Sequence, residues 1–226
     1  MCGRFVQITD PEQIKVSISD LEIDDAVRAK FAKHYNIAPT QEVLTVLNTP
    51  VPRLIFTHWG LVPYWAKDRQ IGSRMINARS ETLAKKPSFQ EPFKKRRCII
   101  FSDGFYEWKS VDKSRTPYFL HRKDGKLLAF AGLWDRWIDR ATRETLISST
   151  IITTDANPLV SEMHDRMPAI LEEDCVRLWL SPEPQPEKAL MDCLKPYPYN
   201  EMEAYSISRQ VNDPRNDSSE IIKPIG

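Results

Sequence analysis

Met1-Cys2-Gly3-Arg4-Phe5 is the stretch around which we expect the rest of the chain to be organised. Removal of Met1 would leave Cys2 with a thiol and an α-amine on adjacent carbons, a pair that no internal cysteine has. The pKa of an α-amine is about 8, so a useful fraction is neutral and nucleophilic at physiological pH. The amine can condense with a carbonyl to a Schiff base, and the thiol can then close a thiazolidine ring. The alternative is an ordinary residue at a frayed terminus.

The composition fits a folded protein with little overall charge. The 226 residues are enough to bury a core, and the hydrophobic content of 41% and aromatic content of 10% are ordinary for globular proteins. A formal net charge of +1 excludes the basic excess of a general nucleic-acid coat, so a polyanion site would be a local patch. No apolar run reaches the length of a membrane span, and the N-terminus has no signal-peptide core. We therefore expect a cytoplasmic protein without membrane association.

The cysteines are widely spaced and include no C-x-x-C pair: Cys2, Cys98, Cys175 and Cys193. This spacing indicates neither a zinc module nor a disulfide framework. We therefore expect free thiols, as in a reducing compartment, and neither a metal nor a cofactor.

Hydrophobic patterns and turn signals predict one α+β domain over residues 1–226, with a mostly antiparallel, barrel-like β core flanked by short helices. Thr9-Asp10-Pro11-Glu12 has the capping residue, first-turn proline and acid of a helix start, and we expect this helix to end near Asp20. A helix start is also expected within 75–82, and residues 212–226 are predicted to form a polar tail. The other expected strands are 42–47, 53–59, 98–101, 146–154 and about 204–208, and the other expected helices are 88–95, 172–180 and 187–194.

Two further predictions concern a turn and a basic run. Residues 117–121 and 127–133, joined through Lys123-Asp124-Gly125-Lys126, predict a β-hairpin. Lys94-Lys95-Arg96-Arg97 follows a predicted helix, where basic residues are typical of a solvated end that complements the helix dipole. Phosphate contact is the alternative for this run.

Cys2, Asn77, Glu107 and His164 place reactive or hydrogen-bonding side chains in separated segments. Each has an ordinary explanation as well. Glu107 could be the solvent-facing member of a strand, His164 a satisfied core residue, and Asn77 a turn or cap residue. Taken singly, none of them indicates a site.

Together with their neighbours, these residues resemble the SOS response-associated peptidase family, which includes the abasic-site sensor proteins of bacteria and vertebrates. The matching segments follow the family's order and cover nearly the whole chain. They are Met1-Cys2-Gly3-Arg4-Phe5, Tyr35-Asn36-Ile37-Ala38-Pro39, Trp59-Gly60-Leu61-Val62-Pro63, Asn77-Ala78-Arg79-Ser80-Glu81-Thr82, Arg97-Cys98, Gly104-Phe105-Tyr106-Glu107-Trp108, Ala131-Gly132-Leu133-Trp134, Thr153-Thr154, Ala156-Asn157, His164-Asp165-Arg166-Met167-Pro168 and Val211-Asn212.

The resemblance implies a DNA–protein crosslinking activity in which a ring-opened abasic sugar is captured on Cys2 as a thiazolidine. On this basis Glu107 is the acid/base for sugar opening and imine formation. His164 would stabilise the abasic site and move protons, and Asn77 would orient the reacting terminus. Such a reaction shields the lesion with limited turnover, although the family can reverse its own crosslink. No cofactor is implied.

The resemblance also implies a set of DNA-binding residues. Arg4, Arg79 and Arg166 would bind phosphates, since the forked guanidinium suits them. Trp65 and Trp108 would stack or wedge against bases. The set is completed by Asn36 and Pro39. The partner would be single-stranded DNA containing abasic sites, or a single-strand to double-strand junction, bound by a monomer.

Two other functions remain open from the residues themselves. A cysteine hydrolase would use Cys2 and His164 as nucleophile and base, and it would not need the α-amine. A non-covalent single-strand binding module would use the aromatic residues and arginines alone.

Overall fold

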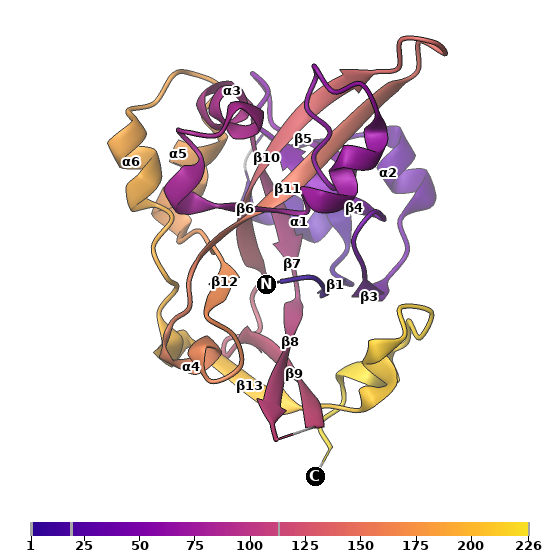
Figure 1. The fold of residues 1–226 in the computed structure, drawn as a ribbon, viewed down its shortest axis with the longest axis vertical. Coiled ribbons are helices and arrows are strands. Elements are labelled where there is room, and N and C mark those ends of the chain that lie inside the picture. Colours follow the sequence, from indigo (N-terminus) through magenta and orange to yellow (C-terminus); the bar gives the residue numbers. More distant parts are fainter. Residues whose placement is uncertain (1, 19, 113, 226) are drawn as a thin grey trace.

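Five strands close into a barrel at the centre of the molecule, as the computed structural model shows (Figure 1). The structure describes residues 2–18, 20–112 and 114–225. The ring runs β11–β10–β7–β4–β5, and β5 pairs again with β11 through Ser148↔His58 and Ser149↔Trp59. This last pairing is parallel, whereas the other pairings in the ring are antiparallel. The strands are β4 (Glu42–Leu47), β5 (Arg53–Trp59), β7 (Arg97–Ser102), β10 (Leu128–Ile138) and β11 (Thr145–Asp155).

Short strands extend the barrel sheet. β2 (Glu22–Ile23) pairs with β5, while β6 (Asn77–Arg79) and β12 (Arg166–Pro168) both pair with the last part of β11. Thr153 of β11 is opposite Arg79 on one side and Pro168 on the other. β11 therefore brings β6 and β12, which are far apart in the sequence, to its two sides.

A second, antiparallel sheet holds the opening stretch of the chain. Its order is β13–β9–β8–β1–β3, so β1 lies between β8 and β3, with Phe5 opposite Phe105 and Ile37. The strands are β1 (Phe5–Gln7), β3 (His34–Ile37), β8 (Gly104–Val111), β9 (Ser114–Arg122) and β13 (Met202–Ser206). The predicted α+β fold with a mostly antiparallel, barrel-like core is confirmed.

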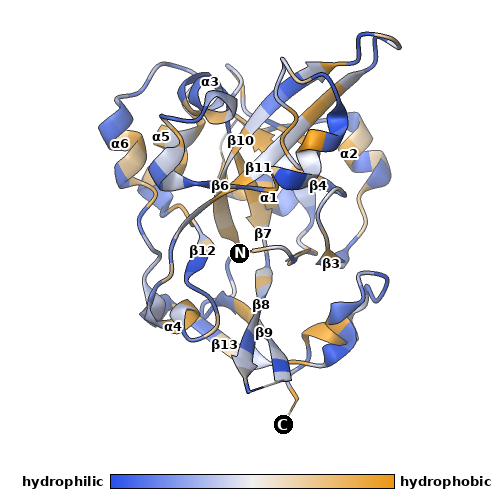
Figure 2. Cartoon of the chain, in the orientation of Figure 1, coloured by the Kyte–Doolittle hydropathy of each residue, from blue (hydrophilic) through white to orange (hydrophobic). Residues whose placement is uncertain are grey.

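Aromatic side chains join the two sheets. Phe5 packs edge-on against Trp59 of the barrel, with ring centroids 4.9 Å apart, and against Phe130 at 6.0 Å. All three side chains are fully buried. The strands around them form the apolar centre of the molecule, and the helices present hydrophilic residues outward (Figure 2). Burial of these rings fixes the position of the residues just before Phe5.

The flanking helices are short, as expected. Asp10 caps the first of them by accepting a hydrogen bond from the Glu12 amide at 2.8 Å. The helices are α1 (Pro11–Ser17), α2 (Asp25–Lys30), α3 (Pro87–Lys95), α4 (Pro158–Ser161), α5 (Glu173–Leu180) and α6 (Glu187–Asp192), with 3₁₀ turns η1 (Arg69–Arg74), η2 (Ser80–Thr82), η3 (Tyr199–Glu201), η4 (Arg209–Asn212) and η5 (Ser219–Ile222). Over the described ranges, none of the helices is long and apolar enough to cross a membrane.

The predicted hairpin of residues 117–133 is wrong. β9 pairs with β8 and β13, whereas β10 pairs with β7 and β11, so the turn around Gly125 carries the chain from one sheet to the other. A turn signal reports that the chain changes direction, but it does not report which strands then pair. The expected helix start within 75–82 is also corrected, because Asn77–Arg79 is a strand and only Ser80–Thr82 forms a 3₁₀ turn.

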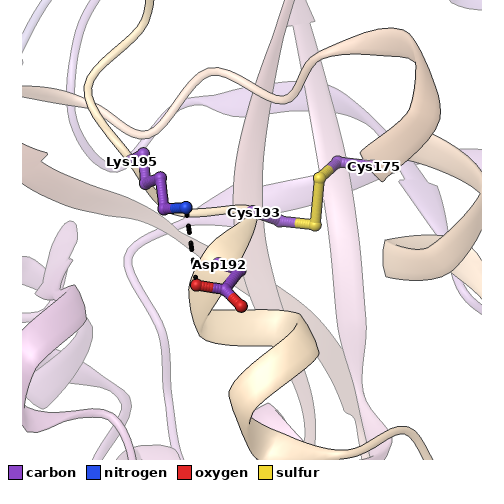
Figure 3. The surroundings of a disulfide bond; sticks show 4 residues. All are labelled: Cys175, Asp192, Cys193 and Lys195. Atoms are coloured by element: carbon purple, nitrogen blue, oxygen red, sulfur yellow. Dashed lines mark ion pairs between the residues drawn. A yellow bond between two sulfur atoms is a disulfide. The ribbon is translucent and has the colours of Figure 1, made fainter.

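The prediction of free thiols is wrong for one pair of cysteines. Cys175 of α5 and Cys193, just after α6, form a disulfide with Cα atoms 5.6 Å apart (Figure 3). Their positions differ by 18 in the sequence, and no motif indicates the pairing. Cys2 and Cys98 are free and buried.

The basic run is also different from its prediction. Arg97 is fully buried, and its guanidinium donates to the carbonyl oxygens of Trp179, Ser181, Phe93 and Lys94. These carbonyls belong to the last turns of α5 and α3, where a cation complements the helix dipole. Lys94 and Lys95 alone form the exposed end.

Candidate functional site

Cys2 lies three residues before Phe5, the first residue of β1, and β1 runs near the middle of the molecule (Figure 1). The side chain of Cys2 is fully buried, and its Sγ is 4.0 Å from the Arg4 carbonyl oxygen. The Cys2 carbonyl oxygen accepts a hydrogen bond from Asn77 Nδ2 at 2.8 Å. A frayed terminus is therefore excluded for Cys2. Met1 lies outside the described residues, so the structure does not bear on the expectation that it is removed.

Asn77 is positioned by β6 and by the segment before it. Gly60 has a φ of 141°, and a Cβ there would lie 2.6 Å from the Gly72 carbonyl oxygen, so glycine is required where this segment crosses itself. The Trp59 indole donates to the Ile76 carbonyl at 2.9 Å, and Asn77 then pairs with Ile151. Asn77 Oδ1 is buried and accepts no hydrogen bond from the described residues.

Glu107 lies on β8 opposite Tyr118 and is only 4% exposed. The solvent-facing alternative is therefore wrong. Burial raises the pKa of Glu107 to about 7, with a further contribution from the negative charge of Asp165. A carboxyl with this pKa can both take and give a proton near neutral pH.

The Cys2 thiol is close enough to the Glu107 carboxyl for the charge of Glu107 to affect it. Burial raises the pKa of the Cys2 thiol far above its ordinary range, and the Glu107 charge raises it further. The thiol is therefore protonated at neutral pH. This environment is the opposite of the electropositive one that activates a hydrolytic cysteine.

His164 lies between α4 and β12, with its side chain 32% exposed. Its Nδ1 accepts a hydrogen bond from the Arg166 amide at 2.9 Å and also lies 2.8 Å from Asp165 Oδ1. Nδ1 cannot accept from the amide and donate to the carboxylate in the same protonation state. Burial lowers the pKa of His164, which favours the neutral ring with its proton on Nε2. His164 then offers an N–H donor.

These contacts bring the four predicted residues into one neighbourhood. Asn77 binds Cys2 directly, Glu107 and Cys2 interact electrostatically, and Asp165, next to His164, raises the pKa of Glu107. The sequence offers Asp165 only as a possible ion-pair partner of an arginine, and its effect on Glu107 was not predicted. No cluster of His, Cys, Asp and Glu suited to a metal occurs in the described parts of the chain.

Arg166 is placed differently from a phosphate ligand. It is 6% exposed, and its guanidinium donates to Glu81, to Asp155 at 2.6 Å and to the Thr153 carbonyl at 2.6 Å. The guanidinium therefore fastens β12, β11 and η2 together. In this structure Arg166 forms a structural ion pair, and its contact with a DNA phosphate stays a prediction.

Asn36 is also buried, at 2% exposure, and does not face solvent as a DNA ligand would. Its Nδ2 donates to the carbonyl oxygens of Val211, Asp213 and Asn216, and its Oδ1 accepts from Arg4 at 2.7 Å. The predicted polar tail is thus docked against β3. Asn36 therefore anchors this tail, and its contact with DNA stays a prediction.

Arg4 belongs to the same network, because it also donates to the carbonyl oxygens of Val211 and Asn212. Asn212 in turn accepts a hydrogen bond from the Trp108 indole at 2.8 Å. Trp108, Arg115 and Asn212 line a shallow surface hollow of about 360 Å³. Arg115 and the side chain of Asn212 were not identified from the sequence, because only the docked tail brings them beside Trp108.

The remaining DNA-binding candidates lie at the surface. Arg79 is exposed at the end of β6, Trp65 is 42% exposed, and Pro39 is half-buried. Trp65 belongs to the segment that leads to Asn77. A larger groove of about 730 Å³ lies between α1 and α5 and contains none of the predicted site residues.

Fold and site together define a class of protein in which a buried cysteine near the N-terminus lies beside a protonatable carboxyl on an α+β barrel. The sequence model of the SOS response associated peptidase (SRAP) family matches residues 1–214. The chain belongs to this family, and the resemblance found in the sequence is confirmed.

Bacterial relatives match the chain over nearly its full length. The abasic site processing protein YoqW of Bacillus subtilis is 43% identical over 226 residues, which cover 99% of each chain. The abasic site processing protein YedK of Escherichia coli is 29% identical, with 100% of each chain covered. The abasic site processing protein HMCES of Gallus gallus is 34% identical over 76% of this chain and 57% of its own. A crystal structure of a protein from Bacteroides thetaiotaomicron superposes with a TM-score of 0.90, at 27% identity, over 99% of this chain and 100% of the other.

Proposed function

We propose that this protein processes abasic sites in DNA by capturing the open-chain sugar covalently on Cys2. The observation that carries the proposal is the buried Cys2 beside Asn77 and a Glu107 carboxyl with a pKa of about 7. The names of relatives that match over the full length of the chain support the choice of substrate.

The proposed reaction consumes one aldehyde and releases one water. After removal of Met1, the Cys2 α-amine attacks C1′ of the sugar to form a carbinolamine. Glu107 takes the proton that the amine loses and returns it to the departing hydroxyl, giving the imine and water. The Cys2 thiol then adds its sulfur to the imine carbon, and its proton goes to the nitrogen, which closes the thiazolidine.

The other residues position these groups. Asn77 holds the Cys2 carbonyl, which orients the amine and the thiol. His164, with its proton on Nε2, would donate to a sugar oxygen during ring opening. We assign single-stranded DNA, including its junctions with duplex, to the surface around Arg79, Trp65 and Trp108, bound by a cytoplasmic monomer with limited turnover.

The high thiol pKa argues against a cysteine hydrolase. A hydrolytic Cys–His pair needs a thiolate, and burial beside Glu107 disfavours the thiolate of Cys2. A sample with its α-amine blocked and its thiol free should therefore neither hydrolyse amides nor crosslink DNA.

A denaturing gel tests the proposal with single-stranded DNA that carries one abasic site, and with intact DNA as control. Wild-type protein should give a band that survives denaturation only with abasic DNA. Cys2→Ser keeps the amine but lacks the ring-closing sulfur, so the lasting adduct should be lost. Cys98→Ala is the matched control, since Cys98 is the other buried free cysteine. A stable adduct at wild-type yield from Cys2→Ser would contradict the thiazolidine, and no adduct from any protein would contradict the function.

A further inference from the structure

The ends of β10 and β11 project from the barrel as an arm, residues 135–148 (Figure 1). The strands stay paired from Asp135↔Ser148 to Ile138↔Thr145, and residues 139–144 form the tip. One face of the arm is fastened to the segment of residues 60–75. The Trp137 indole donates to the Ala66 carbonyl at 2.8 Å, and Asp135 accepts from the Tyr64 amide at 3.0 Å. The arm therefore has a defined direction.

Exposed cations gather on the arm and on the segment beside it. Arg136, Arg140 and Arg143 lie on the arm, and Lys67, Arg69 and Arg74 lie on the segment. Within the described ranges, none of these cations forms an ion pair. We call them the arm cations. They contrast with the net charge of only +1 for the whole chain.

Two of the nearby acidic side chains accept hydrogen bonds from backbone amides. Asp139 accepts hydrogen bonds from the amides of Ala141 and Thr142, and Asp68 accepts one from the Gln70 amide. The Thr142 and Ala141 amides lower the pKa of Asp139, and the charge of Arg69 lowers it further, which places Arg69 near the tip. Glu144 is the remaining exposed acid there, so the surface keeps a positive excess.

β11 connects the arm to the candidate site. Asn77, which binds Cys2, is opposite Ile151, and the strand continues from there to Thr145 at the foot of the tip. At about 3.3 Å per residue, this stretch is roughly 20 Å long. The exposed Trp65 lies on the segment that flanks it. Each nucleotide of a strand spans at least about 3.4 Å, the rise in a duplex, so the distance corresponds to at most roughly six nucleotides of DNA.

We propose that the arm cations bind phosphates of the DNA that extends away from the lesion, roughly 20 Å from Cys2. Guanidinium groups without protein partners suit phosphate oxygens, and their position along β11 continues the path from Cys2 past Trp65. This inference rests on the proposed function. It adds a second point of attachment that depends on the length of the flanking DNA.

Binding is measured with DNA that carries a non-reactive tetrahydrofuran analogue of the abasic site. The short form has about two nucleotides on each side, too few to reach the arm, and the long form has about fifteen. The arm variant is Arg136→Gln with Arg140→Gln. The matched control is Arg177→Gln with Lys188→Gln, which removes exposed, unpaired cations of α5 and α6 from among the described residues.

For the long DNA, the arm variant should raise Kd about tenfold and reduce the log–log salt slope by about 1.4, since each single-strand phosphate contact contributes about 0.7. For the short DNA, its Kd should stay within about twofold of wild type, and the control should stay within about twofold for both. The inference is overturned if the arm variant binds long DNA with the Kd of wild type. It is also overturned if the arm variant loses as much affinity for short DNA as for long DNA, or if the control variant loses as much affinity for long DNA as the arm variant. Crosslinking of short reactive abasic DNA reports on Cys2 separately, so its failure would count against the proposed function and not against the arm.

Discussion

Glu107 is the residue at which the proposed chemistry is most sensitive to a small change. Glu107→Gln keeps the shape of the side chain but cannot exchange a proton, so crosslinking should slow about a hundredfold. Affinity for non-reactive abasic DNA should barely change. Single-turnover crosslinking and equilibrium binding on the same DNA check both expectations. Glu162→Gln is the control, because Glu162 is exposed and pairs with Lys109. Equal rates for Glu107→Gln and wild type would make Glu107 a structural residue.

The same substitution should increase stability in alkaline solution. Burial raises the folded-state pKa of Glu107 to about 7, against about 4.3 for an unfolded glutamate. The folded state thus binds the proton more tightly, and the free energy of unfolding decreases as pH rises from about 4.3 to about 7. Glu107→Gln lacks this loss, so its free energy of unfolding should exceed that of wild type by about 3 to 4 kcal/mol above pH 7 and match it below about pH 4. Denaturant unfolding across this range measures the difference, and a difference that is independent of pH would contradict the burial argument.

Arg79 and Arg166 should separate into a binding role and a structural role. Arg79→Ala should reduce the salt slope of single-strand binding by about 0.7 and leave stability nearly unchanged, since its side chain is exposed. Arg166→Ala should leave the slope unchanged and lower the free energy of unfolding by about 2 kcal/mol, because the buried Thr153 carbonyl loses its donor. Salt titrations and denaturant unfolding of both variants make each the control of the other. A reduced slope for Arg166→Ala would restore its phosphate role.

Elements with a local signal were predictable, and those that depend on partners far along the chain were not. The strands 42–47 and 53–59 have the predicted bounds, because runs of apolar and β-branched residues on either side of a proline turn specify them locally. The predicted hairpin at 117–133 was wrong because β9 and β10, although consecutive in the sequence, belong to different sheets. The disulfide was missed for the same reason, since only the packing of α5 and α6 brings Cys175 to Cys193.

The docking of the tail onto β3 is an element-level contact that can be tested directly. Asn36→Ala removes three donated hydrogen bonds and leaves tail carbonyls unpaired, so the free energy of unfolding should fall by about 2 kcal/mol. Cleavage by added protease near residues 213–217 should also become faster. Asn216→Ala, which loses one exposed bond to the Gln210 carbonyl, is the control and should change little. Equal cleavage of both variants would mean that the tail is held by other contacts.

For the whole molecule, the sequence predicted the class of fold and the segments that meet at Cys2, but not how deeply they are buried. Burial arises from contacts across both sheets. Burial therefore determines the pKa of Glu107. It also determines that Arg166 pairs with acidic residues and that Asn36 binds the tail, and no local sequence pattern indicates either contact. The catalytic roles of Cys2, Asn77, Glu107 and His164 came from the family resemblance, and they stay predictions until the variants are measured.

The closure of the barrel by β5 and β11 has a consequence for motion. This contact spans only two residue pairs, supported by the Thr57 and Ser149 hydroxyls at 2.7 Å, whereas β10 and β11 pair over seven. Local unfolding should therefore start there, and the Gly60 amide, bound to the Ser149 carbonyl, should exchange its hydrogen faster than amides between β10 and β11. Such an opening would loosen the segment that carries Trp65 and leads to Asn77 while the rest of the barrel stays folded, giving DNA a way in.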